Sequence, residues 1–211
     1  KNDKLNLDAT YFPMLAQDYK KHKNKLLFPC FIQPKLDGYR MIYNSAKKTM
    51  TSRTNKPFNI LKSHESLYKE LSNIKEDVIL DGELYVHDPT FKFENFGVLR
   101  KTKKLTENEL INLCKIEYHV YDIIDLKSTF TERNTKIKKF FENNKFNKIK
   151  YVPSIIVENE TEMENAHINH VIDGYEGTMV RNSLGKYKTK FRSYDLLKYK
   201  NFNDSEYKIV N

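Results

Sequence analysis

Lys35 occupies the position in this sequence that most invites a chemical role. It lies in the stretch FIQPKLDGYRMIYN (31–44), between Pro34 and the run that begins Leu36-Asp37-Gly38, with apolar residues on both sides. The pattern predicts a strand, a tight turn and a second strand, with the lysine at the mouth of a buried strand pair. Burial and neighbouring charges can shift a lysine toward its neutral, reactive form, so this position differs from that of an ordinary surface lysine.

Two other pairs of residues have spacings that matter for chemistry. Lys198 and Lys200 are two positions apart, so a strand would direct both side chains to one face. His167 and His170 are three apart, and on a helix such residues can share a metal ion. No further histidine or cysteine lies at a useful spacing, so we interpret the histidines as an ordinary buried or surface pair. The lone Cys30 and Cys114, without a CxxC motif, are expected to be reduced thiols.

The elements that must position these residues are a mixture of strands and helices. Strands are expected on both sides of the turn within 31–44 and at 49–53, 77–88 (turning at Gly82), 118–125, 152–158, 177–182 and 195–200. Helices are expected at 15–26, 60–74, 106–114 behind a Thr106–Glu109 capping box, 131–144 and around 163–170. Antiparallel hairpins with interspersed helices predict an α+β fold rather than a doubly wound parallel sheet.

Length and composition describe a soluble, intracellular chain with one domain. The 211 residues with 39% apolar content can bury a substantial core, and only six glycines and no low-complexity linker mark internal boundaries. No apolar run approaches the roughly 18 residues of a membrane helix, and the first residues lack a secretory leader. A net charge of +9 suits a polyanionic partner. An AT-rich genome would also enrich lysine, so charge alone leaves both explanations open.

Six motifs in register over nearly the whole chain carry a resemblance to a known family. They are KLDGYR, TSRTNKPF, VILDGELYVHD, YHVYDIID, EGTMVRN and DLLKYKNFNDSEYKIV. Together they resemble the nucleotidyltransferase (adenylation) domain of ATP-dependent DNA ligases, in the covalent superfamily shared with mRNA capping enzymes and RNA ligases. The resemblance implies an ATP-grasp-like domain of antiparallel sheets with flanking helices over residues 1–211.

The resemblance implies that Lys35 is the nucleophile that takes AMP from ATP. A lysine must be neutral to attack phosphorus. Lowering its pKa from about 10.4 to near 7 requires that the site prefer the neutral amine by about 4 to 5 kcal/mol. In such a domain a Mg²⁺ ion, Lys198 and Lys200 would supply this preference and stabilise charge on the α-phosphate. The product would be a lysyl-AMP phosphoamide.

The remaining roles are also implied by the resemblance. Glu83 would meet the ribose or a metal, and Glu176 would bind Mg²⁺. Arg53 would hold the ribose or a DNA 5′-phosphate, and Arg181 and Lys198 would contact phosphate. Tyr121 would stack on adenine, although in isolation it reads as core. The nucleotide site would also include the main chain around Gln33, which would read the base edge, together with Arg40 and Lys200.

The implied function is sealing of nicks in duplex DNA by a monomer. Family members continue into an oligonucleotide-binding (OB) fold, which we expect beyond this chain, with NFNDSEYKIV as its entrance. Within the superfamily the alternative is an mRNA capping guanylyltransferase, which SRTN and EGTMVR disfavour. Outside it, the alternative is a basic nucleic-acid-binding module that has kept the fold without catalysis.

Overall fold

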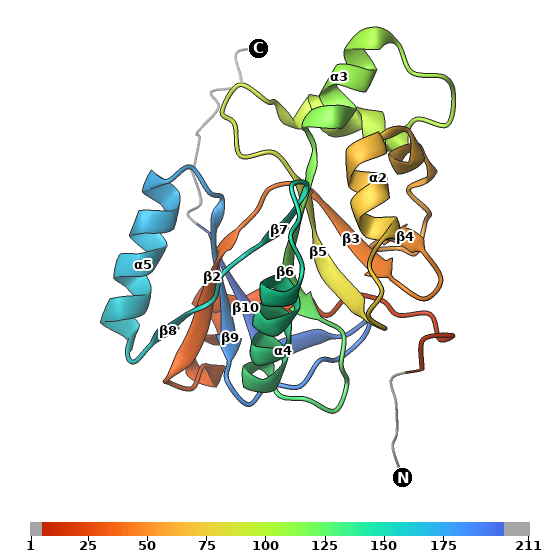
Figure 1. Ribbon diagram of the computed structural model, residues 1–211. Helices are drawn as coiled ribbons and strands as arrows, with labels where there is room; N and C mark the ends of the chain where they lie inside the picture. Colours follow the sequence, from red (N-terminus) through yellow and green to blue (C-terminus); the bar gives the residue numbers. More distant parts are fainter. Residues whose placement is uncertain (1–5, 201–211) are drawn as a thin grey trace, which may run out of the picture.

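Two five-stranded sheets meet at one edge of a central cavity and carry the helices on their outer surfaces (Figure 1). The computed structural model describes residues 6–200. The first sheet has the order β1 (Leu15–Asp18), β10 (Arg192–Lys200), β9 (Gly177–Asn182), β2 (Cys30–Lys35) and β8 (Ile155–Val157). The second has the order β4 (Thr49–Ser52), β3 (Tyr39–Asn44), β5 (Ile79–Tyr85), β6 (Glu117–Ile123) and β7 (Ile149–Tyr151). Only the β1–β10 and β6–β7 pairs are parallel, so the predicted α+β class is confirmed.

The helices cover the outer faces of the two sheets. In Figure 1, α5 (Glu160–Ile172) lies beside the first sheet, whereas α2 (Glu65–Ser72) and α4 (Phe130–Asn143) lie against the second. The other helical elements are α1 (Tyr19–His22), α3 (Glu107–Lys115) and the 3₁₀ segments η1 (Lys23–Lys25), η2 (Asn59–Ser63) and η3 (Phe93–Arg100). The predicted Thr106–Glu109 capping box starts α3, and a second box, Thr129–Glu132, starts α4.

The strands on either side of Lys35 form, but they do not pair with each other as the sequence predicts. Strand β2 pairs with β9 and β8, whereas β3 pairs with β4 and β5. The turn at Gly38 therefore carries the chain from one sheet to the other. A side chain at Gly38 would overlap the carbonyl oxygen of Leu84 in β5, which explains glycine at this crossing. Lys35 consequently lies where the two sheets meet.

Two further predictions about local structure are wrong. Leu15–Asp18 is a strand rather than the start of a helix, because β1 pairs in parallel with β10 and Asp18 then caps the short α1. The chain also does not turn at Gly82. Strand β5 runs straight through this glycine with a register shift against β6, and a side chain there would overlap the carbonyl oxygen of His119. Tertiary pairing decides the structure at both places.

The core is divided between the two sheets and their junction. The largest cluster lies between the second sheet and α2, α3 and α4, and includes Leu67, Leu84 and Tyr118, all fully buried. A smaller cluster joins α5 and α1 to the first sheet through Tyr19, Ile32 and other buried residues. A third fills the contact between the sheets. The sheets are therefore fixed relative to each other, which gives the cavity between them a defined shape.

Candidate active site

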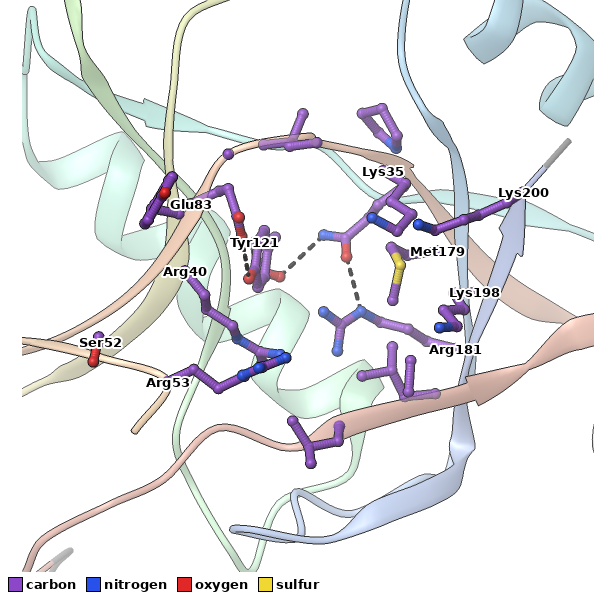
Figure 2. A pocket seen from close by; sticks show the side chains of 18 of the residues that line it. Lys35, Arg40, Ser52, Arg53, Glu83, Tyr121, Met179, Arg181, Lys198 and Lys200 are labelled. Carbon is purple, nitrogen blue, oxygen red and sulfur yellow. Dashed lines mark hydrogen bonds between the residues drawn. The ribbon is translucent and has the colours of Figure 1, made fainter. Parts of the chain in front are cut away.

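A cavity of about 660 Å³ opens where the two sheets meet (Figure 2). This volume is in the range of small-ligand pockets in proteins. Its lining contains nine of the ten residues that the sequence singles out, from six strands and the end of β4: Gln33, Lys35, Arg40, Arg53, Glu83, Tyr121, Arg181, Lys198 and Lys200. Glu176 is the exception, because it lies beside the cavity and contacts two of its lysines. The fold therefore gathers Gln33 and Lys200, 167 positions apart in the chain, around one space.

Lys35 and Lys200 share the carboxylate of Glu176. The amine of Lys35 contacts Oε2, and the amine of Lys200 contacts Oε1. All three are partly buried, with exposed side-chain fractions of 18% for Lys35, 24% for Glu176 and 35% for Lys200. Burial acts to raise the pKa of Glu176, but the hydrogen bonds from Lys200 and Lys35 hold it below its ordinary value. The carboxylate is therefore ionised at neutral pH.

The backbone around Gly177 brings these three charges together. Gly177 in β9 is the register partner of Lys35 in β2 and of Lys200 in β10, so it lies between the two lysines. A side chain at Gly177 would overlap the carbonyl oxygen of Tyr199 and lie 3.2 Å from Cα of Lys200. The amide of Glu176 donates to the carbonyl of Lys35 at 3.1 Å. Glycine thus allows the close strand approach that places Glu176 between the lysines.

Strand β10 directs a row of residues into the cavity. Leu196, Lys198 and Lys200 line it from one face of the strand, because side chains alternate with a period of two. Lys198 thus lies on the predicted face with Lys200. Arg192 also lines the cavity, from the part of β10 before its register shift against β1. The Nη1 atom of Arg192 donates to the carbonyl of Ala16 at 2.7 Å, which fixes this arginine against β1. With Arg53 on the opposite wall, the cavity has cations on both sides.

Two arginines in the cavity are held by buried aspartates. Arg40 binds Asp81 through Nε (2.9 Å) and Nη2 (2.5 Å), and its Nη1 donates to the carbonyl of Met14 at 2.8 Å. Arg181 donates from Nη1 to Asp122 at 2.8 Å and from Nε to Oε1 of Gln33 at 2.8 Å. Asp81 and Asp122 are register partners on β5 and β6. A paired buried carboxylate fixes its arginine, so both guanidinium groups have defined positions.

The side chain of Gln33 is fully occupied by protein partners. Its Nε2 donates to the carbonyl oxygens of Tyr121 (3.0 Å) and Val152 (3.3 Å), and its Oε1 accepts from Arg181. Only 1% of the residue is exposed. A ligand would therefore contact Gln33 through its main chain, which is the part of this residue that the resemblance implicates.

Tyr121 and Glu83 lie together on the wall formed by the second sheet. The Tyr121 hydroxyl lies 3.2 Å from Oε2 of Glu83, to which it donates, and 3.3 Å from the carbonyl of Gly82. Burial raises the pKa of Glu83 to about 7, although Arg40 and Lys35 act to lower it. The guanidinium carbons of Arg40 and Arg181 lie 5.6 and 5.8 Å from the centre of the Tyr121 ring. The ring is thus part of the cavity wall and not of the closed core.

The donors present fit a Mg²⁺ ion held through Glu176. Mg²⁺ usually binds one or two carboxylates and completes its shell with water and phosphate oxygens. Glu176 offers an ionised carboxylate, whereas Glu83, with its raised pKa, is the poorer ligand at neutral pH. Within residues 6–200, no group of three or more His, Cys, Asp or Glu could close a metal site. A metal here would therefore depend on ligand oxygens as well as on Glu176.

His167 and His170 form the buried pair that the sequence analysis favours. The Nδ1 atoms of both rings lie within hydrogen-bond distance of Oγ1 of Thr178, at 3.0 Å for His167 and 2.8 Å for His170. Burial lowers the pKa of His170, so this ring is neutral at physiological pH. The pair is a structural link between α5 and β9.

Sequence reasoning missed several residues of the cavity. Leu15 and Ala16 were missed because their segment was expected to be helical, and Arg192 because only the end of β10 was considered. The aspartates that hold the arginines were also missed. An acidic residue inside an apolar strand, as in ILDGEL and VYDII, signals a buried pair.

Comparison with known proteins gives the family of this two-sheet domain. Residues 13–200 match the ATP dependent DNA ligase domain family. The chain is 27% identical over 193 residues to the DNA ligase of African swine fever virus (isolate Warthog/Namibia/Wart80/1980), covering 85% of this chain and 43% of that ligase. This chain belongs to the ATP-dependent DNA ligase domain family, and its two-sheet nucleotidyltransferase fold and α+β class agree with that membership.

Solved structures show the same fold. The Chlorella virus DNA ligase-adenylate structure superposes with a TM-score of 0.71 at 25% identity, over 91% of this chain and 68% of that one. The bacteriophage T7 ATP-dependent DNA ligase in complex with ATP superposes with a TM-score of 0.67 at 19% identity, over 93% and 70%. The chain spans between 21% and 43% of the length of the curated relatives it matches. No helix within residues 6–200 has the length and apolar character to span a membrane.

Proposed function

We propose that this chain is the adenylation domain of an ATP-dependent DNA ligase and that Lys35 carries the AMP group. The amine of Lys35 attacks the α-phosphorus of ATP, a P–N bond forms and pyrophosphate leaves. The AMP then passes to a 5′-phosphate at a nick, and the neighbouring 3′-hydroxyl displaces it to form the phosphodiester bond. The observation that carries the proposal is the position of Lys35 at the mouth of a cavity lined by six further cations, Arg40, Arg53, Arg181, Arg192, Lys198 and Lys200.

The cavity offers separate regions for phosphate and for base. Lys198 and Lys200 lie on the same side as Lys35, where they would bind the α-phosphate and stabilise the charge that develops as pyrophosphate leaves. Tyr121 and the main chain of β2 around Gln33 would hold adenine. Glu83 would meet the ribose hydroxyls, and its protonated form at pH 7 could also donate a hydrogen bond. Arg53 would bind the ribose or the DNA 5′-phosphate.

Arg40 and Arg181 support the nucleotide from fixed positions. Both are held by buried aspartates, so a ligand would meet guanidinium groups that are already oriented. Arg181 also shares a hydrogen bond with Gln33, which joins the phosphate side of the site to the base side. Such preorganisation reduces the cost of ordering the site when ATP binds.

Glu176 would hold Mg²⁺, which when bound would neutralise phosphate charge and favour the neutral amine of Lys35. Both Glu176 oxygens contact lysines, so this carboxylate would have to release Lys35 to accept a metal. Lys200 would remain as its partner. This exchange would free the Lys35 amine only when the metal and nucleotide are in place.

Nicked duplex DNA is the proposed partner of a monomeric protein inside the cell. The net charge of +9 favours phosphate contacts. An OB-fold that follows this domain would orient pyrophosphate during adenylation of Lys35; the segment NFNDSEYKIV, proposed as its entrance, lies outside the described residues.

Sealing of two nicked duplexes would test this proposal. If the second fold serves mainly the first step, residues 1–211 should seal a nick that already carries AMP on its 5′-phosphate faster than a plain nick with ATP. Sealing should weaken with salt, with log affinity falling by about 0.9 per neutralised phosphate for each tenfold rise in salt concentration. Failure on the pre-adenylated nick at every salt concentration, by residues 1–211 and by a longer chain alike, would exclude a DNA ligase.

A further inference from the structure

Tyr175 bridges the two sheets immediately beside Glu176. Its ring stacks on His87 with 4.5 Å between ring centres and an angle of 24°. On another side it meets the edge of His170 at 6.1 Å and 86°. Tyr175 precedes the first residue of β9 by two positions, yet its ring packs against the core of the second sheet. It thus links the strand that follows Glu176 to the opposite sheet.

Both histidines that contact Tyr175 are themselves held in place. Nδ1 of His87 lies 2.8 Å from the hydroxyl of Tyr85 at the end of β5, which belongs to the second sheet. Nδ1 of His170 lies 2.8 Å from Oγ1 of Thr178, which is fully buried in β9 of the first sheet. The Tyr175 ring therefore contacts two histidines, each of which is hydrogen-bonded to a different sheet: His87 to Tyr85 of β5, and His170, in α5, to Thr178 of β9. We call this arrangement of His87, Tyr175 and His170 the ring clamp.

Backbone hydrogen bonds connect the ring clamp to Glu176. The amide of Tyr175 donates to the carbonyl of His170 at 2.9 Å, at the end of α5. The next amide, that of Glu176, donates to the carbonyl of Lys35 at 3.1 Å. Gly174, with φ of +87°, provides the left-handed turn that brings the chain out of α5 into this segment. The segment is thus held on one side by the helix and on the other by β2.

We propose that Tyr175 is a positioning residue that holds Glu176 against Lys35 and Lys200 through the ring clamp. The effect of Tyr175 on catalysis rests on the proposed function, whereas its positioning of Glu176 does not. None of the three clamp residues is part of the cavity lining, so they would act through Glu176 and not by touching the nucleotide. A carboxylate that must serve two lysines tolerates little displacement, because both ion pairs depend on the position of one backbone segment.

The first test measures the Lys35–Glu176 contact without any ligase activity. Each purified variant is treated briefly with an amine-acylating reagent, and modification of Lys35 is measured by mass spectrometry against exposed lysines of the same molecule. A lysine amine that is held in an ion pair is shielded from the reagent and reacts slowly. Glu176→Gln should raise the rate at Lys35 by about three- to tenfold, and Tyr175→Leu should raise it by a similar factor.

Two further variants separate the ring clamp from general packing. Tyr175→Phe keeps the stacked ring and should react like the wild type. Tyr68→Leu removes a partly buried ring that packs against the same core cluster from α2, far from Glu176, and should also leave Lys35 unchanged. If Tyr175→Leu leaves the rate at Lys35 unchanged while Glu176→Gln raises it, or if Tyr175→Phe behaves like Tyr175→Leu, the ring clamp does not position Glu176.

The second test is a double-mutant cycle on the single-turnover rate of AMP transfer to Lys35. Tyr175→Leu should lower this rate with little change in the ATP concentration needed for half saturation. In a Glu176→Gln background it should cause no further loss, because the carboxylate that it positions is already gone. Equal losses in both backgrounds would overturn the inference. A wild type that shows no AMP transfer would instead contradict the proposed function, and the acylation test would still decide the role of Tyr175.

Discussion

The amine of Lys35 contacts Oε2 of Glu176, and the backbone carbonyl of Lys35 accepts a hydrogen bond from the Glu176 amide at 3.1 Å. The candidate nucleophile and the candidate metal ligand are therefore joined by both side chain and main chain. Since Lys200 contacts the other carboxylate oxygen, Glu176 can leave Lys35 without losing all of its cationic partners. The proposed release of Lys35 by Glu176 on metal binding depends on this arrangement.

Gly177→Ala should destabilise the protein, because the new methyl group would overlap the carbonyl oxygen of Tyr199. We expect a loss of at least about 2 kcal/mol in the free energy of unfolding, measured by urea denaturation. Gly97→Ala is the matched control, since a side chain at Gly97 would meet no atom within 4 Å. Equal stability of the two variants would show that β9 and β10 do not need the close approach at Gly177.

Tyr121→Ala should weaken ATP binding by about 1 to 3 kcal/mol if the ring stacks on adenine, by analogy with base stacking on aromatic side chains. Tyr121→Phe should keep most of the affinity. It would still lose the hydrogen bond from the hydroxyl toward Glu83 and Gly82, which should cost about 1 kcal/mol of stability. Calorimetric titration with ATP, together with thermal denaturation, checks both values. A large drop in Tm for Tyr121→Ala with unchanged affinity per folded molecule would assign Tyr121 to the core.

Glu83 should make stability decline as the pH rises toward neutrality. Burial raises its pKa from 4.5 to about 7, so the folded protein retains a proton that the unfolded chain releases. The stabilisation from this proton is complete below about pH 4.5 and is lost as the pH rises through 7, by at most about 3 kcal/mol. Glu83→Gln should flatten the change in free energy of unfolding between pH 5 and 7.5. Parallel pH profiles for wild type and variant would contradict the raised pKa.

Arg133→Ala should be among the most destabilising substitutions outside the cavity. Arg133 is 1% exposed and binds Asp122 at 2.8 and 3.2 Å, and its loss would leave the buried Asp122 carboxylate with one cation fewer beside its other ion-pair partner, Arg181. Removing one member of a buried ion pair typically costs about 3 to 5 kcal/mol. Lys23→Ala removes the cation of an exposed pair with Glu160 and should cost less than about 1 kcal/mol. A cost for Arg133→Ala as small as that for Lys23→Ala would show that Asp122 does not depend on it.

The α+β class, most strands and helices, and ten candidate site residues, nine of which line the cavity, could be predicted from the sequence, because these depend on periodicity and on recognisable motifs. The sequence could not predict that β2 and β3 belong to different sheets. A short turn between two apolar runs usually joins the two strands of a hairpin. Here β2 pairs with β9 and β3 pairs with β5 instead, and both partners lie far along the chain.

Local patterns also failed where long-range contacts override them. Residues 15–26 have a helical composition, but Leu15–Asp18 forms a strand because it pairs in parallel with β10. The sequence predicts a turn at Gly82 because glycine often interrupts a strand. Here glycine instead permits close packing of β5 against His119. The role of Asp81 and Asp122 in holding Arg40 and Arg181 depends on which strands become neighbours, which the sequence does not state.

The most direct test of the central claim is covalent labelling of Lys35. Residues 1–211, and a longer chain that contains them, are incubated with Mg²⁺ and ATP or GTP labelled at the α-phosphate, and the protein is then separated on a denaturing gel. The account predicts acid-labile label from ATP and not from GTP, and none on Lys35→Ala, whose folding is checked by thermal denaturation. Label from GTP, label on Lys35→Ala at the wild-type level, or no label on either chain would contradict it.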